Sequence, residues 1–146
     1  MKIEVPEERI SDFCLHSFVL ETTARMRAHP KYGYVEGGRT GKRCVMISSE
    51  EGADAGWLCT VAVKPDSTYR LSGWIKTKDV TAGSGKGALL NIHNIQPLQT
   101  RALTGTNDWT KVELVFGTGT NAVIQINCLF GGWGRSTGTA WYDDLQ

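Results

Sequence analysis

The stretch TYRLSGWIKT, residues 68–77, decides the fold class of this chain. Read with a period of two, its side chains divide into two rows. One row contains Tyr69, Leu71, Gly73 and Ile75, and the other contains Arg70, Ser72, Trp74 and Lys76. An apolar row opposite a polar row is typical of a β-strand that buries one face in a core and turns the other to solvent.

The same alternation recurs along the chain. The inward rows are Ala88, Leu90 and Ile92; Val112, Leu114 and Phe116; and Ala122, Ile124, Ile126, Cys128 and Phe130. We predict strands over 15–20, 32–36, 43–48, 57–63, 69–77, 88–93, 99–103, 110–116, 122–130 and 138–145, and a short helical turn or loop over 23–28. Glycine-, asparagine- and aspartate-rich joints separate most of them. Closely spaced strands without intervening helices predict an all-β fold, a two-sheet antiparallel β-sandwich of the jelly-roll kind.

Length and composition limit the function classes. A chain of 146 residues is long enough for one domain with a real core, so we expect a single domain over 1–146. A formal net charge of +1 disfavours a nucleic-acid partner bound through phosphate contacts. No apolar run approaches a membrane span, so no membrane partner is expected. The first residues lack the apolar segment of a signal peptide. Location therefore stays open between the cytoplasm and, with an export signal outside this chain, an extracellular or periplasmic site.

The four cysteines are spaced too widely for a zinc site. Cys14, Cys44, Cys59 and Cys128 form no CxxC pair. Cys59 and Cys128 fall in apolar rows and are expected to be small buried hydrophobes. We expect thiols, although spacing alone does not decide whether two of them form a disulfide.

Trp74 is the first candidate binding residue, because it stands among polar neighbours on the outward row. An exposed indole flanked by hydrogen-bonding groups, here Arg70 and Lys76, suits the stacking of a sugar ring. The alternative is that loops or another strand bury Trp74, with Arg70 or Lys76 packing over the ring. The sequence is compatible with both an exposed and a buried Trp74.

Short neutral side chains mark two other outward rows. They are Asn91 and His93 on one strand and Gln125 and Asn127 on another, all suited to hydroxyl recognition. If these strands and that of Trp74 share one sheet, its outer face is a recognition surface. Trp133, between Gly132 and Gly134, is a further candidate at a sheet rim. Trp57 is expected in the core, and Trp109 and Trp141 are expected to be structural.

Four segments resemble a known family. They are VEGGRTGKR (35–43), GWLCTVAVKPDSTYRLSGWIKT (56–77), GTNDWTKVELVF (105–116) and GGWGRSTGTAWYDDLQ (131–146). Their order and spacing, over residues 33–146, are similar to the jelly-roll carbohydrate-binding modules of families four, nine, sixteen and twenty-two, also called galactose-binding-like domains. The resemblance implies a polysaccharide or oligosaccharide partner, and a place in a larger multidomain enzyme.

The resemblance also implies a structural calcium ion. Its ligands would be Asp143 or Asp144, carbonyls of residues 40–42, and an acid near the N-terminus, Glu21 or Asp12. The alternative for Asp143 and Asp144 is a solvated acidic strand end.

The predicted function is non-catalytic, lectin-like carbohydrate binding, with no catalytic residues. The main alternative is a structural or adhesive β-sandwich that mediates protein contacts without binding sugar. A small hydrolase is a third reading. No nucleophile elbow or HExxH motif supports it, and the outward rows carry amides and aromatics rather than paired acids.

Overall fold

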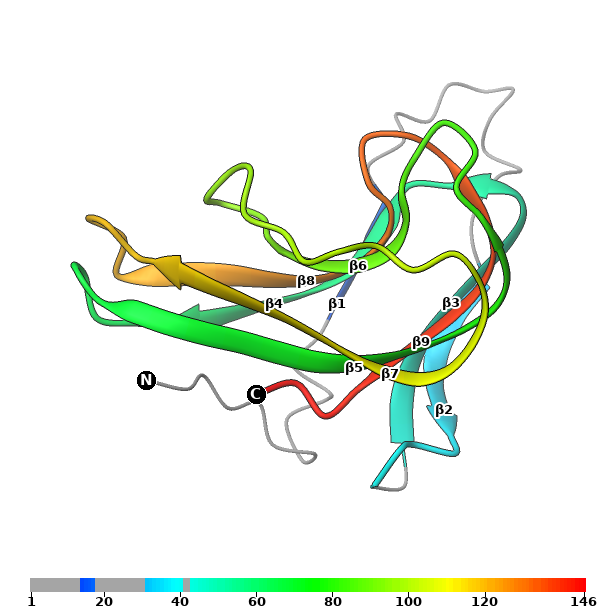
Figure 1. Ribbon diagram of the computed structural model, residues 1–146, viewed down its shortest axis with the longest axis horizontal. Helices are drawn as coiled ribbons and strands as arrows, with labels where there is room; N and C mark the ends of the chain where they lie inside the picture. The colour runs from blue at the N-terminus through cyan, green and yellow to red at the C-terminus, as the bar shows by residue number, and fades with distance from the viewer. Residues whose placement is uncertain (1–13, 18–30, 41–42) are drawn as a thin grey trace.

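The computed structural model describes residues 14–17, 31–40 and 43–146. Its strands are β1 (Cys14–Ser17), β2 (Lys31–Glu36), β3 (Arg43–Ala53), β4 (Ala55–Ala62), β5 (Thr68–Thr81), β6 (Gly87–Ile92), β7 (Gly105–Gly117), β8 (Val123–Gly131) and β9 (Ser136–Asp143). They form two antiparallel sheets, ordered β1-β4-β8-β6 and β2-β3-β9-β5-β7, that lie over one another (Figure 1). The predicted all-β jelly-roll sandwich is confirmed.

Most predicted strands are present, with two differences. The segment 99–103 forms only isolated bridges to β6, at Gln99 and Leu103. Thr100 interrupts regular pairing there, because its Oγ1 accepts a hydrogen bond from the amide of Leu90 in place of a backbone carbonyl. Residues 105–108, which lie outside the predicted strands, begin β7, since Gly105 pairs with Val80 and Asn107 with Thr77.

The predicted N-terminal elements are only partly described. Of the strand expected over 15–20, the structure gives β1 at Cys14–Ser17, paired with β4. The turn expected over 23–28 lies outside the described residues.

The inward rows of the two sheets meet in one core. The row of β5 lies there, with Tyr69, Leu71 and Ile75 at most 5% exposed. The alternate residues of β6 and β8 face it from the other sheet. Ala122 is the exception: it is exposed because β8 begins one residue later. A hydrogen bond of 2.6 Å from the Tyr142 hydroxyl to the carbonyl of Leu129 joins the two sheets through this core.

The outward rows lie on two different sheets, which corrects the sequence-based expectation. β5, carrying Trp74, pairs with β7 and β9 in the five-stranded sheet. β8, carrying Gln125 and Asn127, pairs with β4 and β6, which carries Asn91. Trp74 therefore does not share a recognition face with these amides. Alternation tells inside from outside along one strand, but it does not tell which sheet the strand joins.

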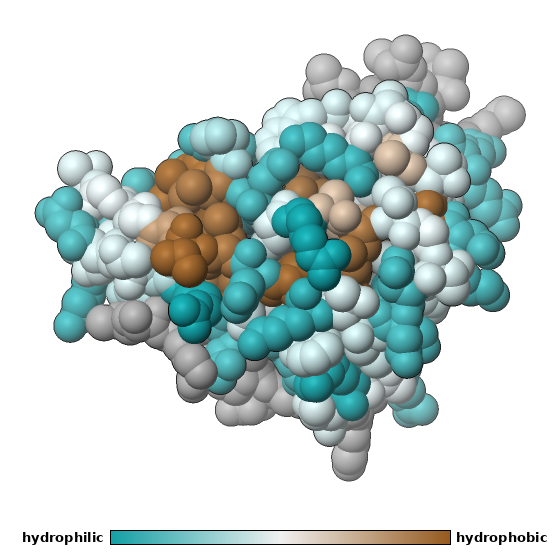
Figure 2. All heavy atoms as spheres, in the orientation of Figure 1, coloured by the Kyte–Doolittle hydropathy of each residue, from teal (hydrophilic) through white to brown (hydrophobic). Residues whose placement is uncertain are grey.

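Partly buried apolar residues continue the core on the side where β6 and β7 are the edge strands. Ile95, Leu98 and Leu114 are partly buried there and extend the core towards the surface. Figure 2 shows hydrophobic side chains reaching the surface in this view, with hydrophilic residues around them. Within the described ranges, no helix is long and apolar enough to cross a membrane.

Replacing Trp57 tests whether its side chain lies in the core. Its ring is 3% exposed, and its Nε1 donates a hydrogen bond of 3.1 Å to the carbonyl of Met46. Trp57→Ala should cost about 3–5 kcal/mol of unfolding free energy and lower the melting temperature by roughly 10 °C or more, measured by thermal denaturation. Trp133→Ala is the matched control, because that side chain is 55% exposed. Equal losses in both variants would contradict the assignment.

Candidate functional site

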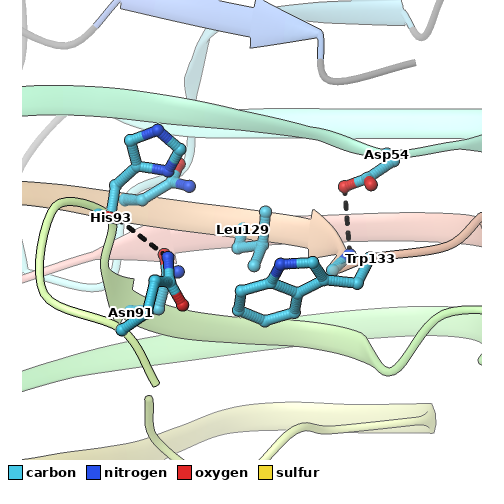
Figure 3. A pocket seen from close by; sticks show the side chains of 8 residues that line it. Asp54, Asn91, His93, Leu129 and Trp133 are labelled. Carbon is cyan, nitrogen blue, oxygen red and sulfur yellow. Dashed lines mark hydrogen bonds between the residues drawn. The ribbon is translucent and has the colours of Figure 1, made fainter. Parts of the chain in front are cut away.

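A pocket of about 110 Å³ opens on the outer face of the four-stranded sheet. Its lining residues are Asp54, Asn91, His93, Gln96, Asn127, Leu129, Gly132 and Trp133. Asn91 comes from β6, and Asn127 and Leu129 come from β8. Figure 3 shows Trp133, Leu129, Asn91 and His93 around one hollow, with Asp54 beside the turn that carries Trp133. The structure thus brings together four predicted site residues: Asn91, His93, Asn127 and Trp133.

Asn91 and Asn127 are buried with polar atoms that have no hydrogen-bond partner. They lie opposite each other across the β6–β8 pair, 1% and 0% exposed. Among the residues that the structure describes, Oδ1 of Asn91 and both Oδ1 and Nδ2 of Asn127 have no partner. An unsatisfied buried polar group costs about 1–3 kcal/mol, and such groups are rare in folded proteins. Water or a bound molecule can supply the donors and acceptors that these three atoms lack.

Gly56 of β4 makes room for the Asn127 side chain. A Cβ atom added at Gly56 would collide with Oδ1 of Asn127. The amide thus lies over the neighbouring strand at the point where that strand has no side chain. A glycine at this position keeps the amide in the pocket wall.

The turn after β8 presents Trp133. Gly131, Gly132 and Trp133 all have positive φ, at 102°, 75° and 57°. Positive φ is uncommon and strained for a tryptophan, so other contacts must hold the turn. Asp54 supplies them, because its Oδ1 accepts a hydrogen bond of 3.1 Å from the amide of Gly132. The backbone amides of Trp133 and Gly134 also donate to this carboxylate.

Cations and neutral groups complete the rim. The Trp133 ring lies under Nζ of Lys86, 4.7 Å from the ring centroid, and that Nζ also donates to Gln99. On the other side, Nε2 of Gln96 donates to the carbonyl of His93, 2.8 Å away. His93 is half-buried at this end of the pocket.

Gln125 is near this site but outside the pocket lining. It stands two residues before Asn127 on β8 and is half-buried. Its backbone amide donates to Oδ1 of Asn94, and its carbonyl accepts from the amide of His93. Its position is therefore fixed by the segment that follows β6.

The pocket has the chemistry of a binding site. A flat indole, a leucine side chain and carboxamides can contact both the C–H groups and the hydroxyls of a sugar ring. Asp54 is the one acidic side chain among the described residues that line the pocket. Glycoside hydrolysis ordinarily needs two carboxyl groups. The Asp54 carboxylate already accepts a hydrogen bond from the turn that carries Trp133.

The remaining predicted binding residues, Arg70, Trp74 and Lys76, lie on β5, outside this pocket. Trp74 is half-buried, and the guanidinium of Arg39 lies 3.6 Å from its ring centroid. A cation does pack over Trp74, as one of the two readings held, but it comes from Arg39 rather than from Arg70 or Lys76. Lys76 instead lies over Trp141, with Nζ 5.4 Å from the ring centroid.

Asp143 and Asp144 are bound to the loop after β2. Oδ2 of Asp143 accepts from the amide of Arg39 at 2.6 Å, and its Oδ1 accepts from the amide of Asp144 at 2.8 Å. Asp144 accepts from Oγ1 of Thr40 at 2.7 Å and pairs with the Arg39 guanidinium at 3.0 Å.

A cationic side chain and backbone amides contact these carboxylates in the structure. Across the described ranges no three histidine, cysteine, aspartate or glutamate side chains are grouped to hold a metal ion. Glu21 lies outside the described residues, so the predicted calcium site stays a prediction.

Sequence reasoning missed Asp54, Gln96 and Gly56. Asp54 lies in the short joint between β3 and β4, and its partners follow β8, far along the chain. No spacing in the sequence relates the two. The run of glycines around Trp133 was a usable signal, because closely packed turns with positive φ need such residues.

The chain is similar in sequence to a nuclease and similar in fold to several solved structures. No model of a protein family matches the chain. It is 34% identical over 114 residues to the tRNA nuclease WapA of Bacillus subtilis (strain 168). The match covers 68% of this chain and 5% of that protein, so the chain spans only a small part of its relative.

The similar solved structures include carbohydrate-binding modules and the K1 cleaved adhesin domain of Lys-gingipain from Porphyromonas gingivalis W83. The adhesin domain matches with a TM-score of 0.53 and 12% identity, covering 97% of this chain and 90% of that one. A CBM4 structure matches with a TM-score of 0.56 and 17% identity, covering 82% of this chain and 77% of that one. TmCBM61, solved in complex with beta-1,4-galactotriose, matches with a TM-score of 0.54 and 14% identity, covering 93% and 87%. The chain therefore has the jelly-roll fold of carbohydrate-binding modules.

The ionisation of Asp54 should appear in the pH dependence of stability. Burial raises the pKa of this carboxyl above 3.8, against the opposing effect of its backbone hydrogen bonds. The folded state then holds its proton more tightly than the unfolded state. The stabilisation is complete below about pH 3.8 and is lost as the pH rises through the folded-state pKa. The melting temperature of the wild type minus that of Asp54→Asn should therefore fall as the pH rises from this value towards neutrality.

Thermal melts of both proteins across this pH range measure the difference, and other titrating groups contribute equally to both. A difference that grows with pH would mean that the hydrogen bonds to the Trp133 turn outweigh the cost of burial.

Proposed function

We propose that this domain binds a glycan without catalysis, and that the pocket on the four-stranded sheet is the binding site. The observation that carries the proposal is the set of unpartnered atoms on Asn91 and Asn127 beside the exposed ring of Trp133. Sugar hydroxyls are donors and acceptors at once and can satisfy both ends of the Asn127 amide. The similarity to carbohydrate-binding modules supports a saccharide as the partner.

The size of the pocket suits one edge of one sugar unit. At about 110 Å³ the pocket is larger than one water molecule needs, roughly 10–15 Å³ of such cavity space. A sugar ring contacts Trp133 and Leu129 with its C–H groups and turns its hydroxyls to Asn127 and Asn91. His93 lies at the margin of the pocket and meets the next polar group of the ligand.

The alternative of a structural or adhesive sandwich is weaker at this site. A surface built for protein contacts gains from apolar area, whereas unpartnered amides add a desolvation cost unless the partner satisfies them. Catalysis is not part of the proposal. The nuclease named among the relatives is far longer than this chain, which matches 5% of it. We propose that the domain acts as a binding unit, including when it is joined to other domains.

Two substitutions in the pocket test this function. Trp133→Ala should weaken glycan affinity about tenfold by removing the stacking surface. Asn127→Ala should weaken it less, since one hydrogen bond contributes about 0.5–1.5 kcal/mol net. Glycan arrays followed by affinity gel electrophoresis identify the ligand and measure both effects. Trp74→Ala is the control, because that half-buried indole lies on the other sheet.

Gly56→Ala tests the role of the Asn127 amide in binding independently. Its methyl group displaces the Asn127 amide without removing it, so the affinity should fall as it does in Asn127→Ala. If no plant, bacterial or algal glycan retards the protein, the protein-contact alternative is favoured. If glycan binding depends on Trp74 and not on Trp133, the pocket is the wrong site.

Calcium at the end of β9 is a separate proposal. An ion there would compete with the Arg39 guanidinium for the carboxylate of Asp144 and with the Arg39 backbone amide for that of Asp143. Calcium added to EDTA-treated protein should then raise the melting temperature, and Asp143→Asn should abolish the rise. A melting temperature that does not respond to calcium rejects the proposal.

A further inference from the structure

β7 is the last strand of the five-stranded sheet, so one of its sides is a sheet edge. In an antiparallel pair, two opposite residues turn their N–H and C=O groups either towards each other or away from each other. Ser72 of β5 uses both groups in hydrogen bonds to Gln146, which follows β9 on the side away from β7. Glu113, which lies opposite Ser72, therefore turns its N–H and C=O groups to the free edge.

The backbone groups of Lys111 and Val115 point the same way, because the orientation repeats every second residue along a strand. The Arg101 guanidinium agrees with this, since it donates to the carbonyl of Lys111 at 3.4 Å. No other described residue bonds to the edge-facing N–H and C=O groups of Lys111, Glu113 and Val115. A row of unpaired backbone groups is a template for a further strand.

The side chains of the same three residues are free to meet a partner. Lys111 and Glu113 are exposed, and Val115 is 58% exposed. Within the described part of the chain, neither the Lys111 ammonium group nor the Glu113 carboxylate forms an ion pair. The edge thus carries a cation, an anion and an apolar side chain at every second position.

This order of charges is complementary to itself when two copies of β7 run antiparallel. A two-fold axis places residues at equal distances on either side of the axis opposite each other. With the axis at Val112, Lys111 of each copy lies opposite Glu113 of the other copy. With the axis at Lys111 or at Glu113, like charges lie directly opposite each other, which is destabilising.

Charges on an edge strand ordinarily prevent the pairing of edges. Here they disfavour the two neighbouring registers and favour the one centred on Val112. In that register the exposed Val115 also lies opposite the half-buried Trp109 of the second copy. An aromatic side chain opposite a β-branched one stabilises a strand pair.

Apolar side chains at this edge also gain cover from a second copy. Ile95, Leu98 and Leu114 are only partly buried against the core. A strand placed beside β7 would cover Leu114 further. The contact from Arg101 to the Lys111 carbonyl is long and exposed, so the N–H of Glu113 from the second copy can replace it.

We propose that the free edge of β7 binds a second copy of this chain, as an antiparallel strand pair centred on Val112. The two five-stranded sheets then form one continuous sheet. The two-fold axis is perpendicular to that sheet, so both four-stranded sheets lie on the same side of the dimer. The dimer does not depend on the proposed glycan site.

The test measures self-association by analytical ultracentrifugation over a range of protein concentrations. The wild type should form a reversible dimer. Lys111→Glu and Glu113→Lys should each weaken the dimer about tenfold or more, because each replaces two attractive charge pairs by two repulsive ones. Lys64→Glu is the matched control, since it makes the same charge change at an exposed position in the joint between β4 and β5.

Two rescue experiments identify the register. The double variant Lys111→Glu with Glu113→Lys restores opposite charges across the axis and should dimerise like the wild type. A mixture of the two single variants should form a heterodimer that is tighter than either variant alone. Melting temperatures of all variants show whether each one is folded.

Val115→Pro tests the backbone contacts without changing any charge. Proline removes the edge-facing N–H of residue 115 and leaves the bonds to β5 in place, so the dimer should be lost in a folded protein. A wild type that stays monomeric at every concentration overturns the proposal. Equal losses in Lys64→Glu and Lys111→Glu, or no recovery in the double variant, would place the dimer contact elsewhere and overturn it as well.

Discussion

The closing of two sheets over one core constrains everything else in this molecule. Each strand gives alternate side chains to that core, so the other half of its residues is released from packing. In β8 the inward residues Ile124, Ile126 and Cys128 are fully buried in the core, which fixes the register of the strand. Asn127 is then held on the outer side by its neighbours. The polar wall of the pocket is thus positioned by the apolar residues on the other face of the same strand.

The pocket also needs contacts that sheet packing does not supply. The turn carrying Trp133 has positive φ angles and would not be expected to hold an indole in one place by itself. Asp54 holds it by accepting from consecutive backbone amides, although burial disfavours the charge of its carboxylate. The site therefore combines a rigid wall with a loop whose position depends on one ionisable group. Recognition surfaces often place loops on a rigid scaffold in this way.

Sequence alone predicted the strand pattern well, because burial repeats with a period that can be read from single residues. The inward rows of β5, β6 and β8 followed from alternation, and so did the buried position of Trp57. The pairing of strands did not follow, since alternation carries no information about neighbours. Alternation alone therefore groups Trp74 with Asn91 and Asn127, although Trp74 lies on the other sheet. Arg39 covering Trp74, and Asp54 bonded to the turn after β8, are contacts between distant segments that no local pattern predicts.

Chemical labelling of the buried cysteines can measure how often the folded domain opens. Cys44, Cys59 and Cys128 are all buried thiols, and burial, with smaller contributions from Cys59 and Asp143, raises the pKa of Cys128 well above its usual value. Thiol reagents react with the thiolate, so these groups are protected twice, by access and by protonation. Once Cys14 and Cys44 are replaced by serine, modification of Cys59 and Cys128, which lie in the core, requires the two sheets to separate. The labelling rate of that variant would count opening events in the native protein, without added denaturant and without an attached probe.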